Sequence, residues 1–199
     1  MSEVKKLLVA TKNAHKTAEI RAMLGAGWEV SDLAEHPDIP APKETGMTFH
    51  ENAAIKALAI AKRFDGMVLA DDSGLEVDAL GGAPGVYSAR FAGPRATDAD
   101  NRRKLIEEME WFGAKSSSAR FHCALVLVEH GVVIATFDGV VEGKIITKEN
   151  GAGGFGYDPL FIPEGHSQTF AELSAEIKNG LSHRAAAMKQ LMKWLAEEY

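Results

Sequence analysis

The 199 residues, 46% of them hydrophobic and 25% charged, have an ordinary globular composition and suffice for a hydrophobic core. The net charge of −6 argues against broad binding to a nucleic-acid backbone, although a locally cationic site can still take a small anionic substrate. A single cysteine, Cys123, excludes an internal disulfide framework and a multi-cysteine zinc site. No apolar run reaches the roughly 20 residues that span a bilayer, and no secretory signal is recognisable. We therefore expect a cytoplasmic protein without membrane partners.

The first half of the chain alternates short apolar runs with helical patterns. The runs predict buried strands, and the second of them is expected to end at Asp71-Asp72-Ser73-Gly74. The helical patterns place apolar side chains three and four residues apart. The strands are expected at 7–10 and 67–70, and the helices after residue 16 and from about 48 to 64.

The second half combines a helix, a hairpin and a glycine-rich loop. Thr97 is a good N-cap for a helix to about Trp111, with Asp100 at the third position after it. Residues 119–129 and 132–141 are strand-like and are separated by His130-Gly131, which predicts a hairpin. A last helix is expected from near Ser182. Helices and strands alternate and one strand pair is antiparallel, so we predict an α/β protein with a mixed sheet in one domain, residues 1–199.

The segment Thr11-Lys12-Asn13-Ala14-His15-Lys16 lies between the first predicted strand and a helix. Such a turn presents free backbone N–H groups at a helix N-terminus, where an anion is stabilised. Thr11 and Asn13 can donate side-chain hydrogen bonds, and Lys16 supplies a positive charge for a phosphate. The alternative is an ordinary helix cap formed by Asn13 beside a solvated lysine. The segment 11–16 is not a Walker A loop, because the motif G-x-x-x-x-G-K-[ST] occurs nowhere in the chain.

Asp71-Asp72-Ser73-Gly74 directly follows the apolar residues 67–70. Carboxylates at the C-terminal end of a buried strand suit a site in an α/β sheet, and they are ligands that Mg²⁺ prefers. Successive strand side chains point to opposite faces, so we expect one aspartate in the site and the other capping the following turn. A turn without function is the alternative.

Glu44, Glu51, Asn52 and Lys56 surround the start of the second predicted helix. Asn52 and Lys56 are four residues apart, so they share a helix face. Lys56 can then reach a phosphate, and Glu44, in the irregular segment before the helix, can ligate a metal. The alternative is a solvated polar face.

The glycine-rich segment 151–156 has the spacing G-x-G-x-x-G. A dinucleotide fingerprint requires a helix directly afterwards, which Pro159 opposes, so we reject that interpretation. We expect instead that Phe155 or Tyr157 contacts a flat ring and that Asp158 hydrogen-bonds a base edge. A surface loop with a packed aromatic ring is the alternative.

Lys178 and the run Ser182-His183-Arg184 lie near the C-terminus. Ser182 is a good N-cap, yet cations in the first helical turn oppose the helix macrodipole. Residues that destabilise a helix without an evident local gain are a mild indication of function. Hydrogen bonds from arginine to a 6-oxo group or a phosphate would compensate for this loss of helix stability. Cys123, by contrast, lies in an apolar run and is expected to be a buried, inert thiol.

Taken in order, these segments resemble the inosine triphosphate pyrophosphatase family, whose members hydrolyse non-standard purine nucleoside triphosphates. The resemblance runs nearly from end to end, and the ordered set is far more specific than any one segment. The matching segments are Thr11-x-Asn13-x-x-Lys16, Glu44-Thr-Gly-x-Thr-Phe49, Glu51-Asn52-Ala53, Ala70-Asp-Asp-Ser-Gly-Leu75, Leu80-Gly-Gly-Ala-Pro-Gly85, Ser88-Ala-Arg-Phe91, Gly153-Gly-Phe-Gly-Tyr-Asp-Pro159 and Ser182-His-Arg184.

The resemblance implies a role for each matched position. Residues 11–16 would form the triphosphate-binding turn, and Glu44 and Asp72 would be the magnesium-linked acids. Asp72 would also be the proton acceptor, with Lys16 and Lys56 as catalytic cations. The remaining matches are Ser73, which would contact phosphate, and Phe155, Gly156, Tyr157, Asp158, Lys178, His183 and Arg184, which would bind the base. One position departs from many family members, which have glycine where this chain has His15.

The resemblance also implies an elongated, two-lobed α/β fold with flanking helices and a central cleft, usually assembled as a homodimer. The predicted reaction is attack of water on the α-phosphorus of ITP, dITP or XTP with Mg²⁺ present, giving a monophosphate and pyrophosphate. Two alternatives remain open: a pyrophosphatase for a modified pyrimidine nucleotide, and a nucleotide-binding module without turnover. The presence of both Glu44 and Asp72 argues against the binding module, which has no need of metal acids.

Overall fold

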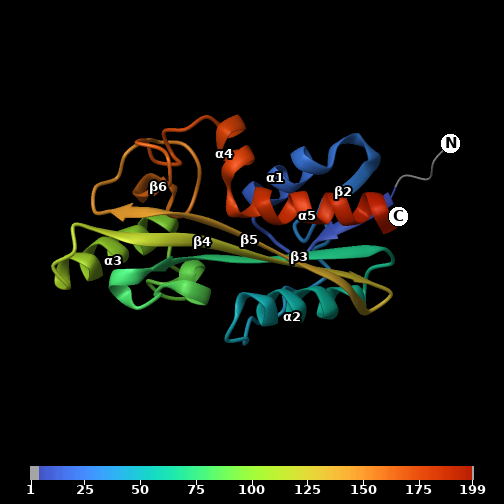
Figure 1. Cartoon of the computed structure of the whole chain (residues 1–199). Helices are drawn as coiled ribbons and strands as arrows, with labels where there is room; N and C mark the ends of the chain where they lie inside the picture. Colours follow the sequence, from blue (N-terminus) through green and yellow to red (C-terminus); the bar gives the residue numbers. More distant parts are fainter. Residues whose placement is uncertain (1–4, 199) are drawn as a thin grey trace. The chain divides into compact units, whose positions relative to one another are not determined.

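The structure, a computed structural model, describes residues 5–198 (Figure 1). The described strands form a six-stranded sheet in the order β2-β1-β3-β4-β5-β6. These strands are β1 (Lys5–Val9), β2 (Trp28–Asp32), β3 (Met67–Val77), β4 (Ser116–Glu129), β5 (Val132–Ile146) and β6 (Phe161–Pro163). The α-helices are α1 (Ala14–Leu24), α2 (Phe49–Ala61), α3 (Asp98–Trp111), α4 (Ala175–Leu181) and α5 (His183–Glu198). Short 3-10 helices are η1 (Gly25–Gly27), η2 (Asp78–Leu80), η3 (Gly85–Arg90) and η4 (Asp158–Leu160).

The sheet is mixed, as predicted. Strand β1 pairs in parallel with both β2 and β3, whereas β5 and β6 are antiparallel. The turn His130-Gly131 joins β4 to β5, and its two residues have φ of 49° and 77°. Two consecutive left-handed residues match the twist of a two-residue hairpin, which joins antiparallel strands. The predicted α/β class and the hairpin are therefore confirmed.

The chain divides into two compact units. The first comprises Met1–Asp72, Cys123–Asp138 and Ala185–Tyr199, and the second comprises Ser73–His122 and Gly139–Arg184. Both units draw on β3, β4 and β5, because the divisions fall within these strands. Among the described residues, no helix is both long and apolar enough to cross a membrane.

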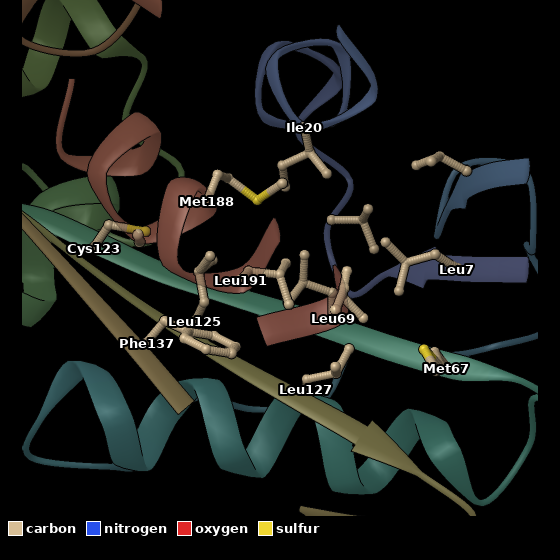
Figure 2. Packing of buried hydrophobic residues seen from close by; sticks show 14 residues of the cluster. Leu7, Ile20, Met67, Leu69, Cys123, Leu125, Leu127, Phe137, Met188 and Leu191 are labelled. Atoms are coloured by element: carbon tan, nitrogen blue, oxygen red, sulfur yellow. The ribbon is translucent and has the colours of Figure 1, made fainter. Parts of the chain in front are cut away.

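The first unit has a hydrophobic layer on each face of its part of the sheet. Leu7, Leu69 and Leu125 pack with α1 and α5, where Figure 2 shows them near Ile20 and Met188. The alternate residues of the same strands pack with α2 on the other face (Figure 1). They are Leu8, Val68, Ala70, Val126 and Val128, joined by Ala10 just after β1. This alternation follows from the two-residue period of a strand, and it decides which helix each later residue of β3 faces.

The second unit has its own core around three phenylalanines. The ring of Phe121 lies 4.7 Å from that of Phe161 and 6.3 Å from that of Phe170, measured between centroids. Helix α3 contributes Leu105 and Met109 to the same core. Its start was predicted: Thr97 caps the helix, and Asp100 completes a reciprocal capping box. Two separate apolar cores thus stabilise the two units.

The prediction that β3 ends at Ala70 is wrong, because the strand continues to Val77. Asp71-Asp72-Ser73-Gly74 has the composition of a turn, but both carboxylates find lysine partners within the first unit. A buried charge that is paired and hydrogen-bonded is compatible with a strand interior. Strands β4 and β5 are also longer than predicted, and β2 and α4 were not predicted at all.

Candidate active site

Asp71 and Asp72 occupy the middle of β3, immediately beyond its pairing with β1. That parallel pairing ends at Val9 and Leu69, and Ala10 N–H then donates to the Leu69 carbonyl at 2.8 Å. The carboxylates therefore lie just past the point where β1 gives way to the turn before α1. The aspartates thus lie beyond the carboxyl end of β1, where sites in parallel sheets are commonly found, although β3 itself does not end there.

The two aspartates contact partners on different helices, as alternation along a strand requires. Asp71 Oδ1 lies 2.5 Å from Lys16 Nζ of α1, and its side chain is fully buried. The thiol of Cys123 donates to Asp71 Oδ2 at 3.4 Å. Asp72 instead contacts Lys56 of α2. The expected capping role for the second aspartate is therefore wrong, since it holds a lysine; the expectation of a buried cysteine is confirmed.

The turn before α1 is organised by Asn13, the N-cap of the helix. Its Oδ1 accepts hydrogen bonds from His15 N–H at 3.0 Å and Lys16 N–H at 3.4 Å, while Asn13 N–H donates to Thr11 Oγ1 at 3.1 Å. The expectation of free N–H groups is therefore wrong at residues 15 and 16, because the cap accepts both. His15 lies in the first helical turn with negative φ, so the departure from glycine has no backbone cost here.

Lys56 links the acids predicted to bind metal. Its Nζ lies 2.7 Å from Asp72 Oδ1 and 2.9 Å from Glu44 Oε1, and it also donates to the Asp71 carbonyl at 2.8 Å. Burial opposes the charged ammonium, but the two carboxylates outweigh burial and raise the pKa of Lys56 above its ordinary value. Lys56 is therefore a fixed positive charge rather than a solvated one, and the alternative of a solvated polar face is wrong at this position.

Burial raises the pKa of the Asp72 carboxyl, an effect that Lys56 only partly offsets. Its Oδ2 is buried and has no hydrogen-bond partner in the described part of the chain. An acceptor oxygen left this way is a suitable ligand for a hard cation. No group of three or more potential ligands among histidine, cysteine and acidic residues occurs in residues 5–198. Mg²⁺ fits this donor set nonetheless, since it is commonly held by one or two carboxylates with water and substrate phosphates.

Glu44 lies in an irregular segment that α2 anchors. Asn52, completely buried on the helix face it shares with Lys56, accepts a hydrogen bond from Gly46 N–H at 2.7 Å. A Cβ on Gly46 would lie 2.6 Å from Glu51 Cβ and 2.8 Å from Asn52 Oδ1. Only glycine therefore allows the chain to approach α2 this closely two residues after Glu44.

In the second unit, Asp158 supports the glycine-rich loop from within. It is buried, and its Oδ2 accepts hydrogen bonds from Phe155 N–H at 2.9 Å and Lys178 Nζ at 2.7 Å. Gly154 has φ +72°, and a Cβ there would collide with the Asp158 carboxylate. The loop is followed by η4 and β6, not by an α-helix, which confirms the rejection of a dinucleotide fingerprint.

Of the two aromatic residues of the loop, Phe155 is the partly exposed one. Lys178 Nζ lies 4.3 Å and Arg184 Cζ 6.0 Å from the centroid of its ring. Tyr157 is buried in the core of the second unit, and its hydroxyl donates to the Ser88 carbonyl at 2.8 Å. Phe155 therefore keeps part of its ring accessible, whereas Tyr157 supports the loop from within the core.

Arg184 and His183 begin α5 and are both buried. Arg184 Nη2 donates to Ser73 Oγ at 3.2 Å, and His183 stacks on Phe121 with ring centroids 5.0 Å apart. Ser182 ends α4 at the position preceding α5. Arg184 is a buried cation in the first turn of a helix, where it opposes the macrodipole, so its position favours a task other than helix stability.

A family model for the Ham1 family matches residues 7–194, nearly the whole chain. The chain belongs to the Ham1 family. This bears out the resemblance inferred from the ordered segments. Curated Ham1-type relatives named dITP/XTP pyrophosphatase occur in several bacteria. One from Halalkalibacterium halodurans is 50% identical over 193 residues, which cover 96% of this chain and 100% of the relative.

Two further relatives and two solved structures extend this picture. The dITP/XTP pyrophosphatase of Bacillus licheniformis is 48% identical over 189 residues, 94% of this chain and 96% of the relative. That of Streptococcus agalactiae serotype V is 49% identical over 197 residues, 96% of this chain, but this chain spans only 61% of that longer protein. A HAM1 protein from Coxiella burnetii has a TM-score of 0.88 at 41% identity, covering 97% of this chain and 99% of that one. The Staphylococcus aureus Ham1 protein has a TM-score of 0.85 at 36% identity, covering 98% and 100%.

The residues predicted for the site of this Ham1 chain fall into two groups. In the first unit, Lys16, Lys56 and Glu44 converge on the adjacent carboxylates of Asp71 and Asp72. In the second unit, Phe155, Asp158, Lys178 and Arg184 form a connected cluster to which Ser73 is hydrogen-bonded. No contact of the Lys12 or Ala14 side chains singles out either residue.

Sequence reasoning missed the supporting residues of this Ham1 chain. Ser88 accepts a bond from Tyr157 and donates through its hydroxyl to the Gly85 carbonyl at 2.6 Å. Asn101 accepts from Ala92 N–H at 2.8 Å and donates to the Ala89 carbonyl at 3.2 Å. The only available signal was Ser88 within a matched segment; nothing in the sequence pattern indicates Asn101.

Proposed function

We propose that this Ham1-family chain hydrolyses the non-standard purine nucleoside triphosphates ITP, dITP and XTP to their monophosphates and pyrophosphate. By doing so it removes them from the nucleotide pool before they are incorporated into DNA or RNA. The observation that carries this proposal is the match, 50% identical and nearly complete on both sides, to a dITP/XTP pyrophosphatase. The chemistry of the side chains described above supports it.

The first unit supplies groups suited to a triphosphate. Ion pairs with Asp71 and Asp72 hold Lys16 and Lys56 in place, so both side chains are positioned before a ligand arrives. Charge stabilisation that needs no rearrangement at the moment of reaction is the main contribution available for phosphoryl chemistry. We assign the two lysines to the phosphate chain, with the turn of residues 11–16 beside them.

We propose Mg²⁺ as the metal, held by Glu44 and Asp72. When bound, it would neutralise phosphate charge and lower the pKa of the attacking water. Lys56 keeps both acids close together, and Asp72 Oδ2 is the atom still available for a ligand or a proton. Water forms a bond to the α-phosphorus, the bond from that phosphorus to the α–β bridging oxygen breaks, and pyrophosphate leaves. Asp72 orients the water or takes its proton.

The second unit supplies groups suited to a purine base. Phe155 offers a ring face, and Lys178 and Arg184 offer donors beside it. A 6-oxo group accepts hydrogen bonds from such donors, whereas the 6-amino group of adenine cannot. Buried donors left without an acceptor make discrimination of about 10⁴ possible. We therefore assign rejection of ATP to Arg184, His183 and Lys178.

A pyrophosphate-release screen tests this function. Turnover of ITP, dITP and XTP should far exceed that of ATP, dUTP and methylated pyrimidine triphosphates, and EDTA should abolish it. Preference for a pyrimidine would favour a different altered base, and binding without pyrophosphate release would reduce the chain to a nucleotide-binding module. We further propose a single-domain homodimer that acts in the cytoplasm, without nucleic-acid partners. Sedimentation velocity gives the oligomeric state directly.

A further inference from the structure

Helix α3 contacts the glycine-rich loop through two residues that no part of the proposed function uses. Asp98 Oδ2 accepts a hydrogen bond from Gly156 N–H at 2.7 Å. Arg102 Nη1 donates to the carbonyl of the same glycine at 2.9 Å. Asp98 and Arg102 are four residues apart on one face of the helix. Both backbone polar groups of Gly156 are therefore held by one rigid helix.

Asp98 and Arg102, which together hold Gly156 and are called the clamp below, are each stabilised by their surroundings. Asp98 is the first residue of α3, where a carboxylate is favoured by the helix macrodipole. Arg102 is largely buried, with 17% of its side chain exposed, and its Nε donates to Glu149 Oε1 at 3.0 Å. Both contacts to Gly156 involve a charged group, and such hydrogen bonds are stronger than neutral ones. The contacts of Asp98 and Arg102 with Gly156 should therefore be stronger than ordinary surface hydrogen bonds.

Phe155 stands between the clamp and Asp158. Its N–H is bound by the Asp158 carboxylate, and the next peptide N–H, that of Gly156, is bound by Asp98. Gly156 has φ +60° with open space around a would-be Cβ, so glycine is required there by its backbone conformation. With the peptide groups on both sides of Phe155 fixed, the direction in which its side chain leaves the backbone is fixed as well.

We propose that Asp98 and Arg102 are positioning residues for base recognition, because they hold the loop that presents the Phe155 ring to the purine. This inference rests on the proposed function, in which Phe155 contacts the base. It predicts an effect confined to ligands that carry a base. The binding of inorganic tripolyphosphate, which has no base, should not depend on Asp98 or Arg102.

Competition assays with two probes test the clamp. IMP, which carries the 6-oxo purine, should bind Asp98→Ala or Arg102→Ala roughly tenfold more weakly than wild type, the factor carried by one charge-assisted hydrogen bond. Inorganic tripolyphosphate should inhibit the variants and wild type equally. Asp98→Asn keeps a side-chain oxygen that accepts from Gly156 N–H, so it should recover most of the IMP affinity. Thermal unfolding monitors the fold of each variant.

Matched controls lie in the same helix. Arg103 is an exposed arginine whose contact is with Asp100, and Glu107 is an exposed carboxylate. Arg103→Ala and Glu107→Ala should leave the affinity for both probes unchanged. An equal loss of IMP and tripolyphosphate binding in a folded clamp variant, or no loss of IMP binding, would overturn the inference. Failure of the proposed function shows itself separately, as absent ITP and XTP turnover by wild type.

Discussion

Lys56 and Asp72 form a buried ion pair in which Nζ lies 2.7 Å from Oδ1, and the same ammonium reaches Glu44 Oε1 at 2.9 Å. One lysine thus bridges two carboxylates that would otherwise repel each other. Its position comes from α2, while Asp72 comes from the middle of β3. In the function proposed above, this arrangement holds two acids together for a cation, and Lys56 adds a positive charge for phosphate.

Lys56→Met should impair both activity and stability. Removing one partner of a buried pair leaves an uncompensated charge, which costs about 3–5 kcal/mol of unfolding free energy. Loss of a positioned cation should lower kcat for ITP about 10²-fold or more, as for other electrostatic catalytic groups. Urea unfolding and steady-state kinetics measure the two effects. Lys62→Met, at an exposed lysine just after the same helix, is the control and should behave as wild type.

Asp72→Asn should abolish most of the turnover, while Glu44 remains as an ion-pair partner for the buried Lys56. The amide keeps the shape of the side chain but loses the charge that we propose to hold a metal and the basicity that we propose to accept a proton. We expect kcat for ITP to fall about 10²-fold or more, within the range for an acid–base or metal-binding group. Titration of Mg²⁺ should show a higher half-saturation concentration. Asp65→Asn, at an exposed position, serves as the control, and near-normal turnover of Asp72→Asn would contradict the assigned role.

Tyr157→Phe should destabilise the second unit. The phenol is buried and donates to the Ser88 carbonyl at 2.8 Å, and burial together with the nearby Asp98 charge raises the pKa of its hydroxyl. Losing this bond leaves a buried carbonyl acceptor and should cost about 1–3 kcal/mol of unfolding free energy. Chemical denaturation measures it. Tyr87→Phe, with 60% of Tyr87 exposed, should change stability little, and equal effects of the two changes would argue against the buried bond.

The capping box of α3 predicts a pH-dependent stability difference. Hydrogen bonds from the Thr97 side chain and backbone lower the pKa of Asp100 from 3.8 to about 2. A carboxyl with a depressed folded-state pKa adds stability that is fully present above its ordinary pKa and is lost as pH falls through the folded one. Wild type should therefore unfold at higher urea concentration than Asp100→Asn at neutral pH. The difference should shrink as the pH falls from about 4 toward about 2. A gap independent of pH would exclude the carboxylate as its source.

Local sequence patterns predicted the elements whose signals lie within a few residues. The capping box at Thr97 and Asp100, the left-handed turn at His130-Gly131 and the buried face of α2 depend only on neighbours along the chain. They could be predicted for that reason. The ordered segments likewise identified the family, because agreement of many weak motifs in one order is improbable by chance.

The continuation of β3 could not be predicted in this way. Asp-Asp-Ser-Gly has turn composition, and partners distant in sequence, Lys16 and Lys56, make its carboxylates tolerable inside a strand. The supporting role of Tyr157 was equally hidden, because it depends on a carbonyl 69 positions away along the chain. In both cases the free-energy cost of burying a charged or polar group depends on partners that are distant in sequence and that the local sequence pattern does not specify.

The sequence alone determined the class of fold and the family, and it supplied the residues that we propose to bind phosphate, metal and base, because each depends on residue type and order. The tertiary structure decided which carboxylate meets which lysine, that Phe155 rather than Tyr157 presents a partly exposed ring, and that α3 anchors the loop at Gly156. The physical reason is burial: the charge state and freedom of a side chain depend on what surrounds it, and that follows only from packing.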